Sequence, residues 1–290
     1  MSELEQAWSS WRAHLAQTAD TETLRRALLQ TAAQMRARSA GSTGLAKEWQ
    51  ALGVHVARAR LASSGTCSER DGRRLVLLAK GESPARQRFT AAHEAAHLLL
   101  GALEPGRLSH GQEERLCDEF ASAYLIDRLL LARRIREVGL PREPLAVLSL
   151  CSSYRVNVQP MLIALGEHLI EQPVLLIASR ERPHPVRPHE LDMRIDAAAG
   201  HGRIFLPRHK RLRTQGLQTL ADWALRAPLH AECHGEDHAA LRARLAAAPV
   251  FPGCVRWHAR MQGERPRFML AAIEVQDLLQ APVASLARAA

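Results

Sequence analysis

The sequence predicts an α+β protein in which long helices surround and follow short strands. Three observations support this class. Apolar residues recur at helical spacing over residues 1–39, 83–138 and 143–170. Short apolar runs typical of strands lie at residues 54–58 and 75–79, and more follow in the last third of the chain. With 290 residues, the chain is long enough for about two domains.

The N-terminal part is expected to be a helical extension over residues 1–44. Trp8, Trp11 and Leu15 begin a pattern with helical spacing that continues to Met35 without Pro or Gly. The run SAGSTG then breaks the pattern and is typical of a linker.

A small antiparallel sheet is expected next. A helix over residues 45–52 ends at Gly53. The two strand candidates, 54–58 and 75–79, are separated by a connection rich in turn residues, which includes SSGT and Asp71-Gly72.

Two strong helices are predicted after the sheet. The first begins at Ser83-Pro84, an N-cap serine followed by proline at the first helical position, and ends before Pro105. The second begins near Gly111 and runs to about Val138, where Gly139 ends it.

A helical block over residues 141–171 separates this part from a C-terminal α/β domain, which we place at residues 172–290. In that domain we expect four strands and two helices. The strands are at 174–178, 203–206, 254–258 and 267–272, and the helices at 215–226 and 237–247.

Composition excludes several classes of protein. No apolar stretch is long enough for a transmembrane helix, and the N-terminus lacks the pattern of a signal peptide. The five cysteines are widely spaced and form no CxxC, so we expect reduced thiols in a cytoplasmic protein. The net charge of +9 comes mostly from Arg, since the chain has only three Lys. Genome composition explains that bias as readily as nucleic-acid binding does.

The segment His93–His97 (HEAAH) is an HExxH motif on the first strong helix. Residues i and i+4 share one helical face, so His93 and His97 can bind the same metal ion. Glu94 lies beside them as the general base of a metallopeptidase.

The next helix offers a third ligand. Glu114 and Asp118 also have i, i+4 spacing, which is the gluzincin arrangement. We expect Glu114 to bind the metal and Asp118 to accept the free N–H of a ligand histidine. The ligand set suits zinc, although a carboxylate ligand also admits manganese or iron.

Two segments resemble the ImmA/IrrE metallopeptidase family. They are RQRFTAAHEAAHLLL (86–100) and ERLCDEFA (114–121). The resemblance implies a mostly helical, gluzincin-like peptidase domain at residues 45–140. This chain departs from the family pattern at Ala96, usually Gly, and at residues 125–128, which lack the usual proline.

Residues 145–165 resemble the block that follows the peptidase domain in the IrrE branch of the family, and we extend the resemblance to the C-terminal domain. The resemblance implies a helix-turn-helix-like (HTH-like) module at 141–171 and a GAF-like sensory domain at 172–290. The second helix of the HTH-like module would follow Val156-Asn157, with Asn157 as its N-cap. That helix carries Gln159, Pro160 and apolar residues, so we favour a packing module over direct DNA binding.

By resemblance, the substrate would be a helix-turn-helix repressor, cleaved to derepress stress or DNA-damage genes. The alternative is a metal-binding regulator that acts on DNA or a protein without proteolysis; the intact Glu94 argues against it. A second oxyanion donor is expected, with Tyr124, Tyr154 and His110 as candidates. A second metal site at His230, Cys233, His234 and His238 and a basic cluster at 207–213 are weaker candidates. The sequence indicates no membrane partner and leaves the oligomeric state open.

Overall fold

The computed structural model describes residues 2–42, 44–141, 144–169, 174–183, 191–200, 255–262 and 265–274. The chain divides into two compact units. The first unit contains Met1–Glu137 together with Cys151–Ala164, and the second contains Val138–Leu150 and Leu165–Ala290. None of the helices in these ranges is long and apolar enough to cross a membrane.

Two helices form the N-terminal extension, α1 (Glu3–Ala16) and α2 (Thr21–Ser39). The predicted helical stretch is interrupted at Asp20, whose side chain accepts hydrogen bonds from the first turn of α2 and closes a capping box. The indole of Trp8 is fully buried and donates a hydrogen bond to Leu52 O at 2.7 Å. The extension is therefore part of the core of the first unit.

The sheet of the first unit has three strands, β1 (Val54–Ala59), β2 (Gly65–Arg70) and β3 (Arg73–Ala79), in the order β1-β3-β2. The expectation of a purely antiparallel sheet is wrong, because β1 and β3 run parallel while β2 runs antiparallel to β3. The segment expected to be a turn-rich connection contains β2. Its side chains are mostly polar and exposed, as suits an edge strand, so it lacks the apolar alternation of a half-buried strand.

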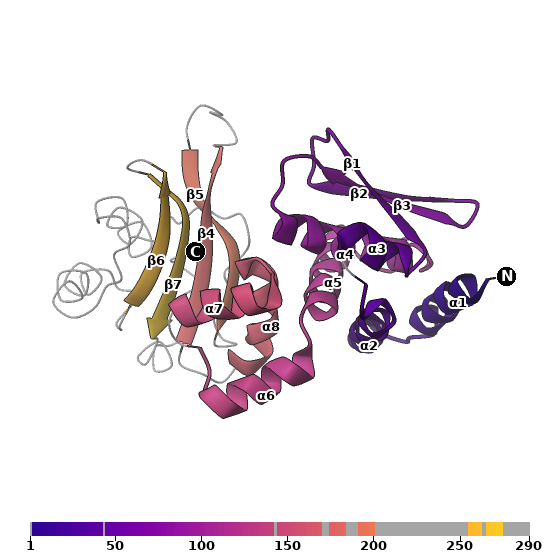
Figure 1. Ribbon diagram of the computed structural model, residues 1–290. Helices are drawn as coiled ribbons and strands as arrows, with labels where there is room; N and C mark the ends of the chain where they lie inside the picture. The colour runs from indigo at the N-terminus through magenta and orange to yellow at the C-terminus, as the bar shows by residue number, and fades with distance from the viewer. Residues whose placement is uncertain are drawn as a thin grey trace. The chain divides into compact units, whose positions relative to one another are not determined.

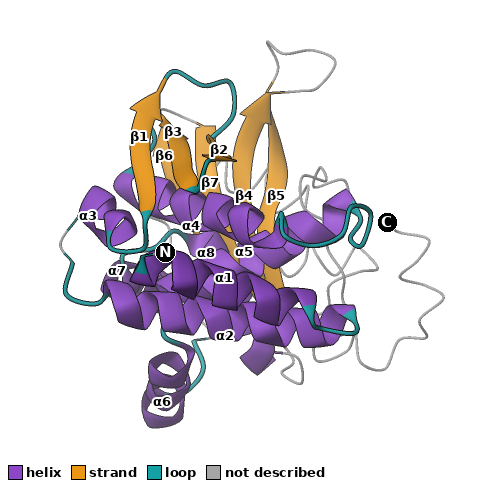
Figure 2. Cartoon of the chain, turned by 90° about the vertical axis from the view of Figure 1, so that its right-hand side faces the viewer, coloured by secondary structure: helices purple, strands orange, loops and turns teal. Residues whose placement is uncertain are grey.

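The two strong helices are α4 (Pro84–Leu100) and α5 (His110–Leu125), and a short helix, α3 (Leu45–Gln50), precedes the sheet. Helices α4 and α5 pack side by side, and β2 and β3 contact α4 (Figures 1 and 2). Helix α2 contacts α5, where Arg25 forms an ion pair with the buried Glu119. These contacts fix the two helices that carry the motifs.

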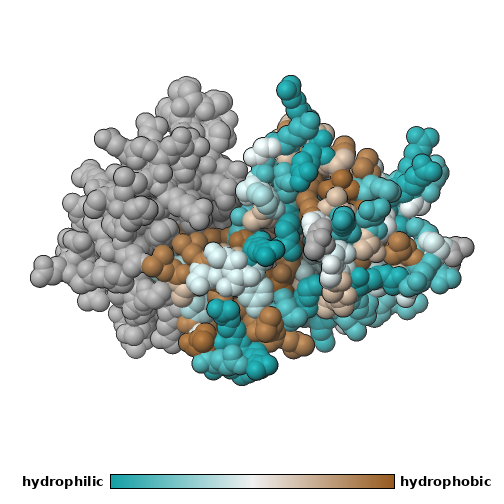
Figure 3. All heavy atoms as spheres, viewed as in Figure 1, coloured by the Kyte–Doolittle hydropathy of each residue, from teal (hydrophilic) through white to brown (hydrophobic). Residues whose placement is uncertain are grey.

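The second strong helix is shorter than expected, because a new helix, α6 (Arg128–Val138), begins after Asp127. The Asp127 carboxylate accepts hydrogen bonds from the backbone N–H groups of Leu129 and Leu130, both at 3.0 Å. A capping aspartate thus begins α6. Leu129 and Leu130 are exposed, and hydrophobic residues lie beside hydrophilic ones in this region of the surface (Figure 3).

The helical block contains α7 (Pro144–Tyr154) and α8 (Val158–Leu169), and Asn157 directly precedes α8 as predicted. The second unit contains a four-stranded antiparallel sheet in the order β5-β4-β7-β6. Its strands are β4 (Val174–Pro183), β5 (Leu191–Gly200), β6 (Val255–Gln262) and β7 (Arg265–Glu274). Strands were expected near β4, β6 and β7, but β5 was missed. The expected strand at 203–206 and both expected C-terminal helices lie outside the described residues, and the GAF-like relationship stays a prediction.

Candidate metal centre

Helix α4 presents His93 and His97 on one face toward α5. The helix begins at Ser83, whose hydroxyl accepts the backbone N–H of Arg86 at 3.3 Å, with Pro84 in the first turn. Between the two histidines, Ala95 and Ala96 are fully buried. Helix α5 begins with a capping box formed by Ser109 and Gln112, which sets the start of the opposite face.

Each imidazole is held at Nδ1 by a carboxylate from α5. Asp118 Oδ1 lies 3.0 Å from Nδ1 of His93, and Glu113 Oε1 lies 2.8 Å from Nδ1 of His97. A carboxylate accepts hydrogen bonds, so these two contacts favour the tautomer of each histidine that carries its proton on Nδ1. Their Nε2 lone pairs are therefore available to a metal ion.

The two Nε2 atoms converge on the carboxylate of Glu114. They lie 3.2 Å from each other. Glu114 Oε1 is 3.3 Å from Nε2 of His97, and Oε2 is 3.5 Å from Nε2 of His93. Two ligand atoms about 2.1 Å from a tetrahedral zinc ion lie about 3.4 Å apart. The spacings among these three residues therefore fit one tetrahedral ion.

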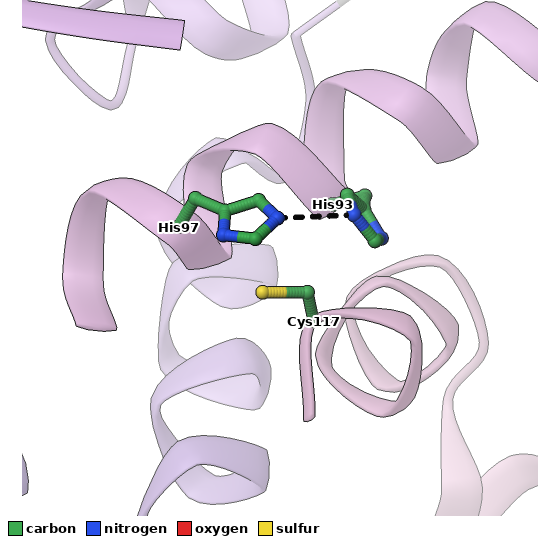
Figure 4. Close-up of side chains that lie close together, drawn as sticks. All are labelled: His93, His97 and Cys117. Atoms are coloured by element: carbon green, nitrogen blue, oxygen red, sulfur yellow. Dashed lines mark hydrogen bonds between the residues drawn. The ribbon is translucent and has the colours of Figure 1, made fainter. Parts of the chain in front are cut away.

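Cys117 offers another donor at the same place. Its buried side chain points from α5 toward the space between the two imidazoles (Figure 4). The donor atoms of His93, His97 and Cys117 all lie within 4.8 Å of one another, so this group could hold a metal ion. Burial, together with the charges of Glu113 and Glu114, raises the pKa of the Cys117 thiol well above its usual range.

The side chain of Glu94 extends toward the edge strand β2. A Cβ atom built on Gly65 would lie 3.2 Å from Oε1 of Glu94 and 2.4 Å from Cγ2 of Thr90, so only glycine fits between strand and helix. Cys67, two residues further along β2, also lies beside Glu94. Burial, then the charge of Glu94, raises the pKa of the Cys67 thiol to about 12.

Of the three candidate oxyanion donors, Tyr124 has its hydroxyl engaged by residues outside this arrangement. The hydroxyl of Tyr124 is buried, donates to Glu48 at 2.9 Å and lies 3.0 Å from Ser39. Burial raises the pKa of Tyr154, and its charged neighbours are Arg134, Asp127 and Arg36. His110 is exposed at the first position of α5. The histidine-rich group at 230–238 and the basic cluster at 207–213 lie outside the described residues.

Sequence reasoning missed the role of Glu113, which contacts His97. Glu113 belongs to the charged run Glu113-Glu114-Arg115, and such a run usually forms a solvent-exposed helix face. The adjacent residues Glu113 and Glu114 can both reach the histidines of α4 only because α5 packs closely against α4. The sequence carried no signal of that packing.

Comparison with curated proteins gives no match. Among solved structures, a Mycobacterium tuberculosis transcriptional regulator is similar at 13% sequence identity and a TM-score of 0.45. That similarity covers 98% of this chain and 85% of the other. Residues 49–145, which include both site helices, match the model of a peptidase family described as the IrrE N-terminal-like domain.

Proposed function

We propose that this protein is a metal-dependent peptidase in which His93, His97 and Glu114 hold a zinc ion. One observation carries the proposal. Nδ1 of each imidazole is hydrogen-bonded to a carboxylate, and the two Nε2 atoms face each other at 3.2 Å. In the tautomer that the carboxylates favour, the two Nε2 lone pairs face each other, and a cation bound between them relieves their repulsion. The family match over residues 49–145 supports the peptidase assignment.

The donor set is two imidazole nitrogens and one carboxylate oxygen, which is typical of catalytic zinc. Manganese or iron also accepts this set. When bound, the ion polarises the scissile carbonyl and stabilises the charge that develops on its oxygen. Asp118 and Glu113 keep both imidazoles in the tautomer that binds metal.

Glu94 is the general base of the proposed reaction. It takes a proton from the attacking water and returns it to the nitrogen of the leaving amine as the peptide bond breaks. Its carboxylate lies against Gly65 on β2. Because β2 is an edge strand of its sheet, it offers backbone groups to which an extended polypeptide can add as a further strand. A polypeptide substrate is therefore consistent with the surroundings of Glu94.

The finer assignment rests on the family resemblance. We propose that the substrate is a helix-turn-helix repressor, cut at one site in the cytoplasm, and that cleavage derepresses stress or DNA-damage genes. The test is incubation of such repressors from the same genome with the purified protein, with and without added zinc. Mass spectrometry should find one metal-dependent cut, and no cut in any of them would contradict this substrate class.

The variant Glu94→Gln tests the peptidase proposal itself. It should keep its metal and lose about 10²–10⁴-fold in cleavage rate, because the amide cannot take the proton. Glu104→Gln, at an exposed position outside the site, is the matched control and should cleave normally. If Glu94→Gln keeps its metal and its full effect in the cell, the protein acts without proteolysis, as a metal-binding regulator.

A further inference from the structure

The first turn of α8 contacts Asp118, the carboxylate partner of His93 in the candidate metal centre. Gln159, in the helix first considered for DNA binding, is only 4% exposed. Its Nε2 donates a hydrogen bond to Asp118 Oδ2 at 3.3 Å, and its Oε1 accepts one from Arg86 Nη1 at 3.1 Å. Because this amide is buried and both its oxygen and its nitrogen are bonded inside the protein, it is not presented to read a base edge.

The orientation of this amide follows from its partners. Arg86 can only donate and the Asp118 carboxylate can only accept, so the oxygen of Gln159 faces the arginine and its nitrogen faces the aspartate. Asp118 uses its other oxygen, Oδ1, for Nδ1 of His93. Four side chains thus form one hydrogen-bonded series that ends on a proposed metal ligand.

A second contact fixes the same turn of α8. Ser122, one helical turn after Asp118 on α5, donates a hydrogen bond to the backbone oxygen of Pro160 at 2.7 Å. Met161 and Leu162, which follow, are fully buried. The start of α8 is therefore held against α5 by packing that does not depend on Gln159. This separation allows a role in positioning to be distinguished from a role in stability.

We propose that Gln159 is a positioning residue of the metal centre, which orients Asp118 and through it the imidazole of His93. The inference rests on the proposed function, since it needs a metal ion bound by His93. It assigns the start of α8 to the catalytic unit, although the match to the peptidase family ends at residue 145.

The test compares Gln159→Leu and Gln159→Glu with the wild-type protein, loaded with zinc or cobalt(II). Affinity is measured by competition with a chelator, and ligand geometry by the visible spectrum of the cobalt form. Gln159→Leu should bind zinc about 10-fold more weakly, at the low end of the effect of outer-shell partners. Gln159→Glu should be worse, because a carboxylate would face Asp118. Both variants should change the cobalt spectrum.

Ser122→Ala is the matched control. It removes the neighbouring contact between α5 and α8 without touching the Asp118 carboxylate, so it should lower the melting temperature but leave zinc affinity and the cobalt spectrum unchanged. Arg86→Met, at a partly exposed position, tests the same hydrogen-bonded series from its other end. It should weaken zinc binding less than Gln159→Leu does.

The outcomes are distinguishable. If the Gln159 variants bind zinc as tightly as the wild-type protein does, this inference is overturned and the proposed function stays intact. An equal loss of zinc affinity in Ser122→Ala would assign the effect to packing and would also overturn it. If a Gln159 variant does not fold, the Arg86→Met variant decides instead. Zinc affinity and a cobalt spectrum equal to those of the wild-type protein would then overturn the inference about Gln159. A wild-type protein that binds no metal would overturn the proposed function itself.

Discussion

Glu113 lies 2.8 Å from Nδ1 of His97, just as Asp118 lies 3.0 Å from Nδ1 of His93. Each imidazole thus has its own carboxylate partner from α5. We expect Glu113→Ala to weaken zinc binding by about 10–100-fold, because His97 loses the group that fixes its tautomer. Glu113→Gln keeps an acceptor oxygen and should lose less. Chelator competition measures both, and equal affinity of Glu113→Ala and wild type would remove Glu113 from the site.

Glu114 and Cys117 compete as the third ligand, and two variants separate them. The Glu114 oxygens lie 3.3 and 3.5 Å from the two Nε2 atoms, whereas the Cys117 sulfur is only placed within 4.8 Å of the imidazoles. We therefore expect Glu114→Ala to lose bound zinc on dialysis and Cys117→Ala to keep one ion per chain. Elemental analysis of the dialysed proteins decides, and the reverse result would make Cys117 the ligand.

Gly65 is the point of close approach between β2 and α4. In Gly65→Ala the new Cβ would lie 2.4 Å from Cγ2 of the buried Thr90, a β-branched residue with little rotamer freedom in a helix. We expect a loss of about 1–3 kcal/mol in unfolding free energy and reduced cleavage, because Glu94 is displaced as well.

The double variant Gly65→Ala/Thr90→Ser removes the obstructing methyl group and should recover much of the lost stability. Thermal and denaturant unfolding of the single and double variants form a double-mutant cycle. Simple additivity of the two changes would show that the clash with Thr90 is not the cause.

Asp127 caps α6 through two backbone N–H groups. Asp127→Ala should cost about 0.5–2 kcal/mol in unfolding free energy. Asp127→Asn keeps an acceptor but loses the ion pair with Arg36, so it should cost less. If Asn and Ala are equally destabilising, the ion pair and not the cap makes the contribution of Asp127.

The sequence predicted the elements whose signals are local. The i, i+4 spacing of His93 and His97, and of Glu114 and Asp118, is a property of one helix and needs no knowledge of the fold. The capping residues Ser83 and Pro84 gave the start of α4 correctly. The strand β2 was missed because an exposed edge strand has no apolar pattern to detect.

Contacts between distant segments could not be read from the sequence. Gln159 and Asp118 are 41 residues apart, and their hydrogen bond depends on how α8 packs against α5. The parallel pairing of β1 and β3 likewise depends on β2 occupying the far edge of the sheet. In both cases tertiary packing, and not local propensity, determines the outcome.

The hydrogen bond between Gln159 and Asp118 has a practical consequence for the choice of fragment boundaries in this chain. A fragment cut where sequence similarity ends, at residue 145, would expose Oδ2 of Asp118 to water and leave the interface of α5 bare. The first compact unit reaches Ala164. The shortest fragment that keeps this hydrogen bond must therefore reach at least Gln159, which lies 14 residues beyond the end of the family match.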